Sequence, residues 1–166
     1  SDQSDSAVVP QNTQGSNKLT DPTPPSPGID ADWITDASQL DAWLQAVPAR
    51  SVLGVDTEFM RRNTFHPQLA LLQLGSADRR ALVDPLAFAI GDTLQRHLGE
   101  RDLICVMHSA GEDLEVLSPM LPQGPSVLFD TQLAAAFAGL GLGLSYRALV
   151  TQFCAVELDK GETRSD

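Results

Sequence analysis

The sequence predicts an α/β fold on a mixed sheet, with an antiparallel start, a parallel continuation and helices flanking the sheet. Two observations carry this prediction. Three short apolar runs come first, at residues 51–56, 69–75 and 80–84, and those within 66–84 are joined by short turns, as antiparallel strands are. Beyond residue 88, segments with helical spacing alternate with apolar runs, which is typical of parallel strands joined by helices.

The first predicted element is a helix that Thr35 or Asp36 can cap, because Leu40, Trp43 and Leu44 follow at helical spacing. The strand at 103–107 is entirely apolar, so we expect it to be covered on both faces. The other predicted elements are the three strands above, helices at 88–98 and from Ser109 to Leu117, a strand at 127–129, and helices that Asp130 and Ser145 can cap, ending at Phe137 and Phe153. This order fits the ribonuclease-H-like architecture.

The chain divides into a tail and one domain. Residues 1–31 are rich in Ser, Pro, Asn, Gln and Asp, and we expect a disordered or loosely ordered tail. Residues 32–166 form the predicted domain, and 42% apolar residues overall allow a sizeable core. Cys105 and Cys154 stand far apart in apolar settings, so we expect two buried thiols in a reducing compartment. No signal peptide or membrane-length apolar run is visible, so we expect a cytoplasmic protein without a membrane partner.

The net charge of −11 has the wrong sign for a protein that grips nucleic acid through a broad basic surface. The same charge does not exclude a small site that acts on nucleic acid. Bound divalent metals would offset negative charge locally and can bridge carboxylates to phosphates.

Asp56 and Glu58 stand two residues apart at the predicted C-terminal end of the first long strand. Residues i and i+2 of a strand point to the same face, so both carboxylates enter one small volume. Like charges resist ionising beside one another, and a divalent cation would remove that conflict. A solvated strand end is the alternative interpretation of this pair taken alone.

Asp113 falls in the first turn of the helix that follows strand 103–107. The carboxyl ends of parallel strands meet at one edge of a sheet, where ligand sites of α/β folds lie. Asp113 can therefore face Asp56 and Glu58 across a metal site. A negative charge at a helix N-terminus is also stabilising by itself, by about 0.3–1 kcal/mol, but Glu112 could fill that role equally well.

These residues resemble known exonuclease motifs. Residues 55–59, Val-Asp-Thr-Glu-Phe, resemble the first motif of the DEDD superfamily, and residues 108–117 resemble the second. The sequence between and after these two motifs looks like ribonuclease D specifically, at residues 60–69, 71–74, 82–86 and 129–137. Residues 158–166 are similar to the family segment that precedes the third motif, and the whole resemblance covers residues 33–166.

The resemblance implies a 3′–5′ exoribonuclease that trims RNA 3′ ends, such as those of tRNA precursors. It implies that Asp56, Glu58 and Asp113 are catalytic and bind two divalent metal ions, Mg²⁺ or Mn²⁺. RNA 3′ ends are then the expected partners, and no protein partner can be inferred. The weaker expectations are substrate contacts from three neighbours of the carboxylates, namely Thr57, Phe59 and His108.

One part of the family pattern is missing. This branch carries a Tyr-x-x-x-Asp motif that supplies a fourth carboxylate and a water-orienting phenol. The single tyrosine, Tyr146, is followed four residues later by Val150. We therefore expect a domain that is truncated at its C-terminal end and that is inactive, or nearly so, as it stands.

Two other functions stay open. The same carboxylates and metals would serve a 3′–5′ DNA exonuclease of the proofreading or helicase-associated type. A non-catalytic nucleic-acid-binding module could also keep the fold, although the three intact carboxylates speak against that.

Overall fold

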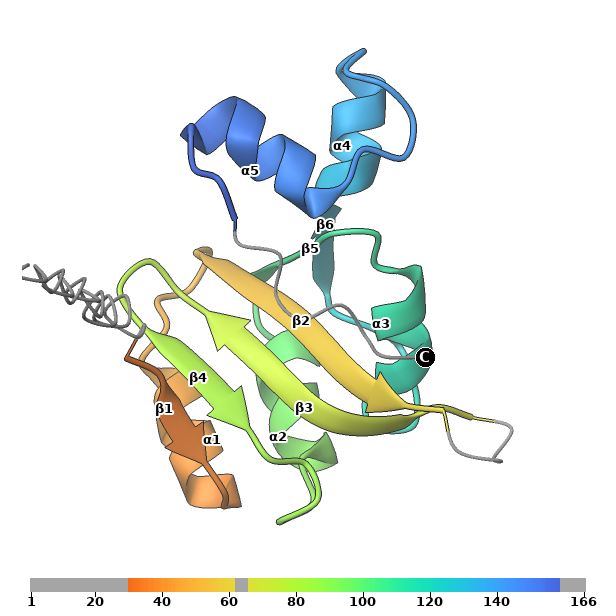
Figure 1. Cartoon of the computed structure of the whole chain (residues 1–166). Helices are drawn as coiled ribbons and strands as arrows, with labels where there is room; N and C mark the ends of the chain where they lie inside the picture. Colours follow the sequence, from red (N-terminus) through yellow and green to blue (C-terminus); the bar gives the residue numbers. More distant parts are fainter. Residues whose placement is uncertain (1–29, 62–65, 159–166) are drawn as a thin grey trace, which may run out of the picture.

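The computed structural model describes residues 30–61 and 66–158 of the chain, which form an α/β structure on one mixed sheet (Figure 1). The strand order is β1-β4-β3-β2-β5-β6. The strands are β1 (Asp32–Ile34), β2 (Val52–Met60), β3 (Gln68–Gly75), β4 (Arg80–Val83), β5 (Ile104–Met107) and β6 (Val127–Asp130). The pairs β2–β3 and β3–β4 are antiparallel, whereas β2–β5 and β5–β6 are parallel, so the predicted mixed sheet is confirmed.

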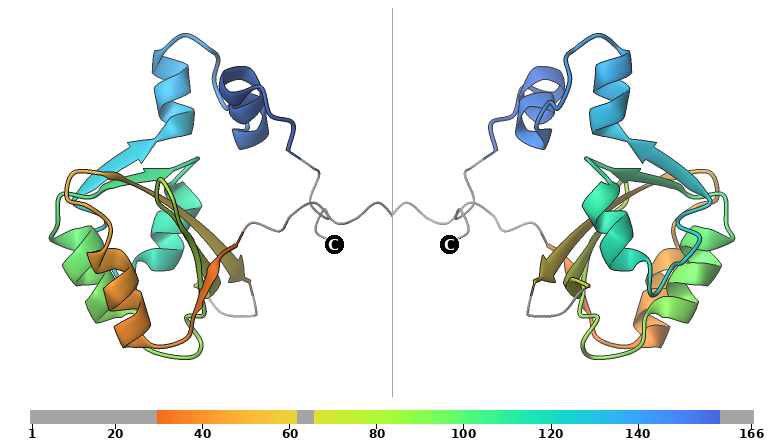
Figure 2. Two further views of the ribbon diagram at one scale, coloured as in Figure 1. Left: turned by 90° about the vertical axis from the view of Figure 1, so that its left-hand side faces the viewer. Right: turned by 90° about the vertical axis from the view of Figure 1, so that its right-hand side faces the viewer.

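The helices lie in two groups around the sheet. They are α1 (Ala37–Gln45), α2 (Gly91–Leu94), its π-helical continuation η1 (Gln95–Gly99), α3 (Gly111–Leu117), α4 (Thr131–Phe137) and α5 (Tyr146–Cys154). Figures 1 and 2 show α1 and α2 side by side on one face of the sheet. Helices α4 and α5 lie beyond the ends of β5 and β6. The opposite face of β2 and β3 carries no described helix and is the open face of the sheet.

The core lies between the sheet and the covering helices. Helix α1 buries the three side chains that its spacing selects, Leu40, Trp43 and Leu44, and Asp36 caps it by accepting the N–H of Gln39 at 2.9 Å. From the sheet, apolar side chains such as Leu72 are completely buried against these helices. The periodicity of the sequence therefore identified the buried side of the first helix correctly.

Four predicted details are wrong or incomplete. Strand β1 was not predicted, because three residues without alternation become a strand only by pairing in parallel with β4. The helix predicted from residue 88 begins at Gly91 and ends in a π-helical turn. Strand β5 is fully covered on one face only, since Ile104 is half-buried while Cys105 is completely buried. Cys154 is exposed, because α5 buries none of its residues.

The tail predicted for residues 1–31 lies outside the described residues except for its last two positions. The family-like segment at 158–166 also lies outside them from residue 159 onward. Both stay predictions. In the part of the chain that the structure does describe, no helix has the length and apolar character needed to cross a membrane.

Candidate active site

Strand β2 carries Asp56 and Glu58 side by side on the open face of the sheet, and both are exposed. The strand continues to Met60, so the pair lies within its second half rather than at its end as predicted. Gln73 is the direct neighbour of Asp56 on β3, and its amide donates a hydrogen bond to Asp56 Oδ2 at 3.3 Å. Strand β2 therefore holds the carboxylates of Asp56 and Glu58 on the open face of the sheet, where a ligand can reach them.

Asp113 lies in the first turn of α3, as predicted, and its residue surface is only 8% exposed. Its Oδ1 accepts two hydrogen bonds from Thr57, one from the backbone N–H at 3.1 Å and one from the hydroxyl at 2.6 Å. Because Thr57 stands between Asp56 and Glu58, these bonds tie the helix to the strand at the carboxylate pair.

The other two carboxylates influence Asp56 electrostatically. Burial raises the pKa of Asp56 above its ordinary value of 3.8, and the negative charges of Asp113 and Glu58 raise it further. A cation shared by these groups would reverse both effects, since positive charge favours the ionised form. Partial burial together with nearby like charges is the electrostatic pattern expected of a cation-binding site.

No group of three His, Cys, Asp or Glu side chains among residues 30–61 and 66–158 already stands in a geometry that could hold a metal ion. The donor chemistry fits a hard divalent cation, because carboxylate oxygens are its preferred ligands. Asp113 is fixed by Thr57, whereas the exposed side chains of Asp56 and Glu58 are free to change rotamer. The residues therefore suit a divalent metal, with two of the three ligands adjusting to it.

The start of α3 is held by a residue from another strand. Ser109 was predicted to cap this helix, but it adopts a positive φ of 58° and makes no such cap. Instead, the carboxylate of Asp130 at the end of β6 accepts the N–H of Ser109 at 3.1 Å and of Ala110 at 2.8 Å. Asp130 also caps α4, as predicted, by accepting N–H groups of its first turn. One carboxylate therefore fixes the loop that aims α3 at β2.

His108 precedes this loop and is anchored to α4. Its Nδ1 lies 2.9 Å from the hydroxyl of Thr131, which itself donates to the carbonyl of Met107 at 3.2 Å. The imidazole is therefore held against α4 through the hydroxyl of Thr131. Within the described part of the chain, the buried Nε2 has no hydrogen-bond partner, and the ring lies edge-on to Tyr146 with centroids 5.7 Å apart. This arrangement shows a positioned histidine; its substrate contact stays a prediction.

Phe59 is half-buried and packs against the core, which favours a structural role for at least part of its ring. A β-bulge between Glu58 and Phe59 interrupts the regular alternation of β2 at this point. Bulges beside functional sites commonly re-aim a side chain. The guanidinium of Arg61 lies 5.4 Å from the Phe59 ring centroid and 3.4 Å from the carboxylate of Glu112. These contacts hold the positively charged side chain of Arg61 beside the carboxylates.

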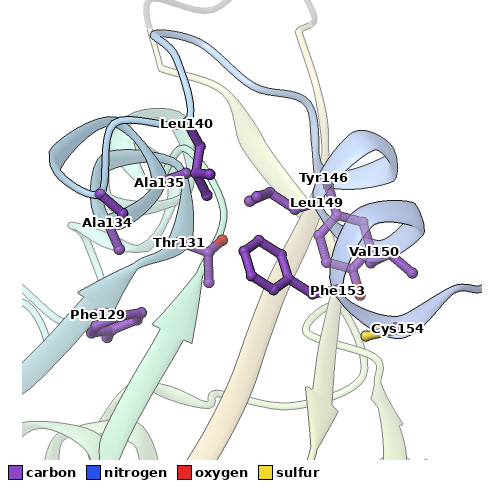
Figure 3. Close-up of a pocket in the computed structure, with 11 residues that line it drawn as sticks. Phe129, Thr131, Ala134, Ala135, Leu140, Tyr146, Leu149, Val150, Phe153 and Cys154 are labelled. Carbon is purple, nitrogen blue, oxygen red and sulfur yellow. The ribbon is translucent and has the colours of Figure 1, made fainter.

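A separate apolar groove of about 460 Å³ lies between α4 and α5. Figure 3 shows Tyr146 and Phe153 of α5 turned toward Thr131 and Ala135 of α4. None of the three carboxylates lines this groove. The predicted site, formed by Asp56 and Glu58 on β2 and Asp113 on α3, is therefore distinct from this groove.

Two residues at the site were not found from the sequence. Gln73 was readable in part, because it is the one polar residue in the run 69–74 and so marks a special position on its strand. Thr131 offered no signal, since its contact with His108 spans 23 positions and depends on the pairing of β5 with β6.

Comparisons with known proteins identify the family of this chain. A family model described as 3′–5′ exonuclease matches residues 31–166. The chain is 47% identical over 135 residues to ribonuclease D of Xanthomonas oryzae pv. oryzae, covering 81% of this chain and 37% of that protein. It is 36% identical over 133 residues to ribonuclease D of Escherichia coli, covering 80% and 36%. The chain thus spans a little over one third of the length of these curated relatives.

Solved structures show the same fold. The crystal structure of Escherichia coli RNase D superposes with a TM-score of 0.76 at 34% identity, covering 83% of this chain and 37% of that one. The catalytic core of RRP6 from Trypanosoma brucei superposes with a TM-score of 0.67 at 21% identity, covering 80% and 37%, which supports the fold alone. The exonuclease domains of this kind are metal-dependent, in keeping with the carboxylates on β2 and α3. The chain belongs to the 3′–5′ exonuclease family.

Proposed function

We propose that this protein is a metal-dependent 3′–5′ exoribonuclease that trims RNA 3′ ends, such as those of tRNA precursors. The observation that carries the proposal is that Asp113 on α3 is hydrogen-bonded to Thr57, the residue between Asp56 and Glu58 on β2, so that the three carboxylates lie around one point of the strand. The names of the relatives favour RNA as the substrate, since they are ribonucleases D.

Asp56, Glu58 and Asp113 are the residues that would hold two divalent ions, Mg²⁺ or Mn²⁺. When bound, such ions stabilise charge on the reacting phosphate and increase the acidity of a water molecule. The protein contributes the placement of the ligands. Asp113 is steadied by two hydrogen bonds from Thr57, whereas Asp56 accepts a single longer bond from Gln73 on β3 and can still change rotamer.

Phe59 and His108 are the proposed contacts for the terminal nucleotide. Both border the carboxylates in the chain, and each is held by the fold, Phe59 against the core and His108 against Thr131. An aromatic or imidazole ring offers a stacking surface to a base of any identity, which suits an enzyme that removes successive nucleotides. The side chain of Thr57 is buried, and we assign it a different task below.

We further propose that this chain by itself has little or no activity. Tyr146 cannot serve as the water-orienting tyrosine of a Tyr-x-x-x-Asp motif, because Val150 stands four residues after it. Its ring packs at the edge of His108 on α5. A site with three carboxylates can still bind a cation, but it leaves the pair of cations that the reaction requires incompletely held.

The test compares this chain with a longer form of the protein on a 3′-extended RNA labelled at its 5′ end, in Mn²⁺ and in Mg²⁺. We expect stepwise shortening from the 3′ end by the longer form and little or none by this chain. Asp56→Asn in the longer form is the matched control and should be inactive. Equal trimming by both lengths would show that the missing motif is dispensable.

The same assay separates the alternatives. A DNA strand of identical sequence that is shortened faster than the RNA would indicate a DNA exonuclease. An inactive longer form whose binding of Mn²⁺ does not depend on the three carboxylates would indicate a binding module. We also propose a cytoplasmic location, which the two free cysteines support, because thiols persist in a reducing compartment.

A further inference from the structure

Thr57 stands between the two carboxylates of β2 in the chain, but its side chain faces the other way. Asp56 and Glu58 are exposed, whereas Thr57 is only 6% exposed. Strand alternation accounts for this difference, because successive side chains point to opposite faces. A residue buried so deeply can act on a substrate only through another residue.

The partner of Thr57 is Asp113, which lies 56 positions later in the chain. Strand β5 pairs with β2 only as far as Gly54, so no strand covers this edge of β2 at Thr57. The carboxylate of Asp113 takes the place of a neighbouring strand and accepts the N–H of Thr57 at 3.1 Å. The hydroxyl of Thr57 donates to the same oxygen, Oδ1, at 2.6 Å.

These two bonds have a consequence for the free oxygen of Asp113. An ionised carboxylate accepts through both oxygens, and the bonds from Thr57 end on Oδ1 and leave Oδ2 to other partners. Charge-assisted hydrogen bonds are short and directional, so they fix the rotation of the carboxylate as well as its depth. They also satisfy a carboxylate that is 92% removed from solvent, which would otherwise be costly to bury.

We propose that Thr57 is a positioning residue for metal binding. Its hydroxyl and N–H lock Asp113 in one orientation, with Oδ2 available to a divalent cation that the exposed Asp56 and Glu58 reach by changing rotamer. The inference rests on the proposed function, because it requires that the three carboxylates bind metal. It replaces the expectation that Thr57 contacts the substrate.

The test uses three variants of this chain and isothermal calorimetry with Mn²⁺. Thr57→Val removes the hydroxyl and keeps the β-branched shape and the N–H, whereas Thr57→Ser keeps the hydroxyl. Thr93→Val is the matched control, since Thr93 is another buried threonine and lies on α2. We expect Thr57→Val to weaken Mn²⁺ binding about tenfold or more, the usual effect of losing an outer-shell partner. Thr57→Ser and Thr93→Val should stay within about twofold of the parent chain.

A second measurement tests whether Thr57 acts through Asp113. In the Asp113→Asn background, Thr57→Val should cause no further loss of Mn²⁺ affinity. In metal-free solution, the two substitutions should lower the unfolding midpoint less together than the sum of their separate effects, as expected for residues in contact.

The outcomes are distinct. Parental Mn²⁺ affinity in Thr57→Val, or equal weakening by Thr57→Ser, overturns the positioning role while the metal site stands. Absence of carboxylate-dependent Mn²⁺ binding in the parent chain overturns the proposed metal site and this inference with it. Additive midpoints in metal-free solution overturn the Thr57–Asp113 coupling whatever the metal does.

Discussion

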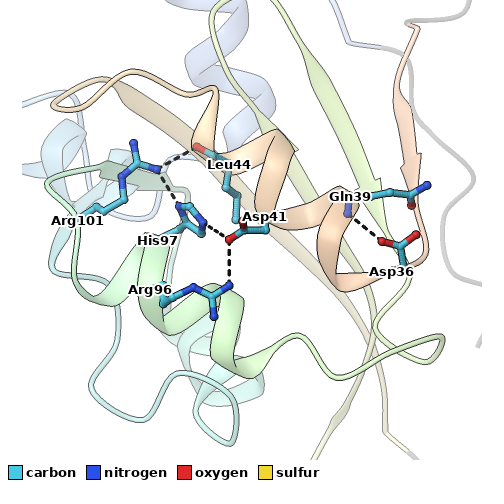
Figure 4. A network of polar contacts seen from close by, with 7 residues as sticks. All are labelled: Asp36, Gln39, Asp41, Leu44, Arg96, His97 and Arg101. Carbon is cyan, nitrogen blue, oxygen red and sulfur yellow. Dashed lines mark hydrogen bonds and ion pairs between the residues drawn. The ribbon is translucent and has the colours of Figure 1, made fainter.

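Two clusters of ionisable side chains in this domain differ in how their charges are matched. The first, the α1 network, comprises Asp41, Arg96, His97 and Arg101 (Figure 4). Asp41 Oδ1 lies 2.8 Å from His97 Nε2 and 2.9 Å from Arg96 Nη2. The second, the carboxylate cluster, comprises Asp56, Glu58 and Asp113, and its negative charges lie near one another.

The α1 network holds its members through directed bonds. Arg101 donates to the carbonyl of Leu44, in the last turn of α1, at 3.0 Å and to that of Val47, just after the helix, at 2.8 Å. It also lies 2.8 Å from His97 Nδ1. A guanidinium can only donate, so Nδ1 accepts and Nε2–H of His97 donates to Asp41. Each polar group in this network has a complementary partner, and the network joins α1 to the π-helical turn.

The pKa directions express the difference. The hydrogen bond from His97, and then that from Arg96, lowers the pKa of Asp41. Burial, and then the charges of Asp113 and Glu58, raises the pKa of Asp56. The carboxylate of Asp41 is therefore paired with Arg96 and His97, whereas the nearest charges to Asp56 have the same sign as its own. The comparison supports our proposal that the carboxylate cluster is the functional one, because a bound cation would supply the missing positive charge.

The largest expected effect breaks the carboxylate cluster. In the longer form of the protein, Asp56→Asn should lower the rate of RNA trimming by about a thousandfold or more, since losing one preorganised charge-stabilising group already costs roughly a hundred to a thousandfold. Single-turnover assays with labelled RNA measure this. Glu58→Gln should behave alike, and residual activity near the parent level in either variant would exclude that residue from the site.

The next effect breaks the α1 network. Arg101→Met should destabilise the fold by about 2–3 kcal/mol, because buried acceptors lose a charged donor. Its Mn²⁺ affinity should stay unchanged, since the network lies away from β2's open face. Urea unfolding measures the stability. Arg50→Met is the control: its pair with Asp102 is 3.9 Å long and largely exposed, and a change below about 0.5 kcal/mol is expected.

A smaller effect sharpens the comparison at Asp130, whose charge is matched by backbone N–H groups. Burial alone would raise its pKa, but the hydrogen bonds from Ala110, Ser109, Leu133 and Gln132 outweigh it, and the pKa is lowered. Asp130→Ala should cost about 1–2 kcal/mol, the upper range for a helix cap. Ser145→Ala removes the single cap bond to Ala148 and should cost less by urea unfolding. Equal losses would show that the bonds to the α3 loop contribute nothing.

The smallest effect concerns pH. Because the pKa of Asp56 is raised in the folded state, ionisation of its carboxyl group opposes folding. The contribution of the protonated carboxyl group to stability is complete below pH 3.8 and is lost as the pH rises through the pKa of the folded state. Asp56→Asn should therefore gain stability relative to the parent chain between about pH 4 and about pH 7, by a fraction of a kcal/mol for a partly solvated group. Asp130 has the opposite sign, and its contribution is present above pH 3.8 and lost as pH falls below it. Chemical unfolding at several pH values without metal measures both, and a pH-independent difference for Asp56→Asn would contradict the proposed repulsion.

Much of this molecule was predictable from local pattern. The helical spacing of apolar residues identified the buried face of α1, and apolar runs identified β2 to β6. Short polar side chains identified the helix caps at Asp36, Asp130 and Ser145. Each of these features depends on residues within a few positions of one another. Features that depend on contacts between residues far apart in the sequence were not predictable. Strand β1 forms because it pairs with β4, and the loop at Ser109 is fixed by a hydrogen bond to Asp130.

The sequence by itself determined that Asp56 and Glu58 share one face of a strand, because an Asp-x-Glu spacing places both side chains on the same side whatever surrounds them. Only the tertiary structure decided what holds them. It turned Thr57 inward onto Asp113, set Gln73 beside Asp56, and placed α3 against the edge of β2 that β5 leaves free. The physical reason is that hydrogen bonds join atoms that are close in space, and the chain brings residues 56 positions apart together only when the sheet has formed.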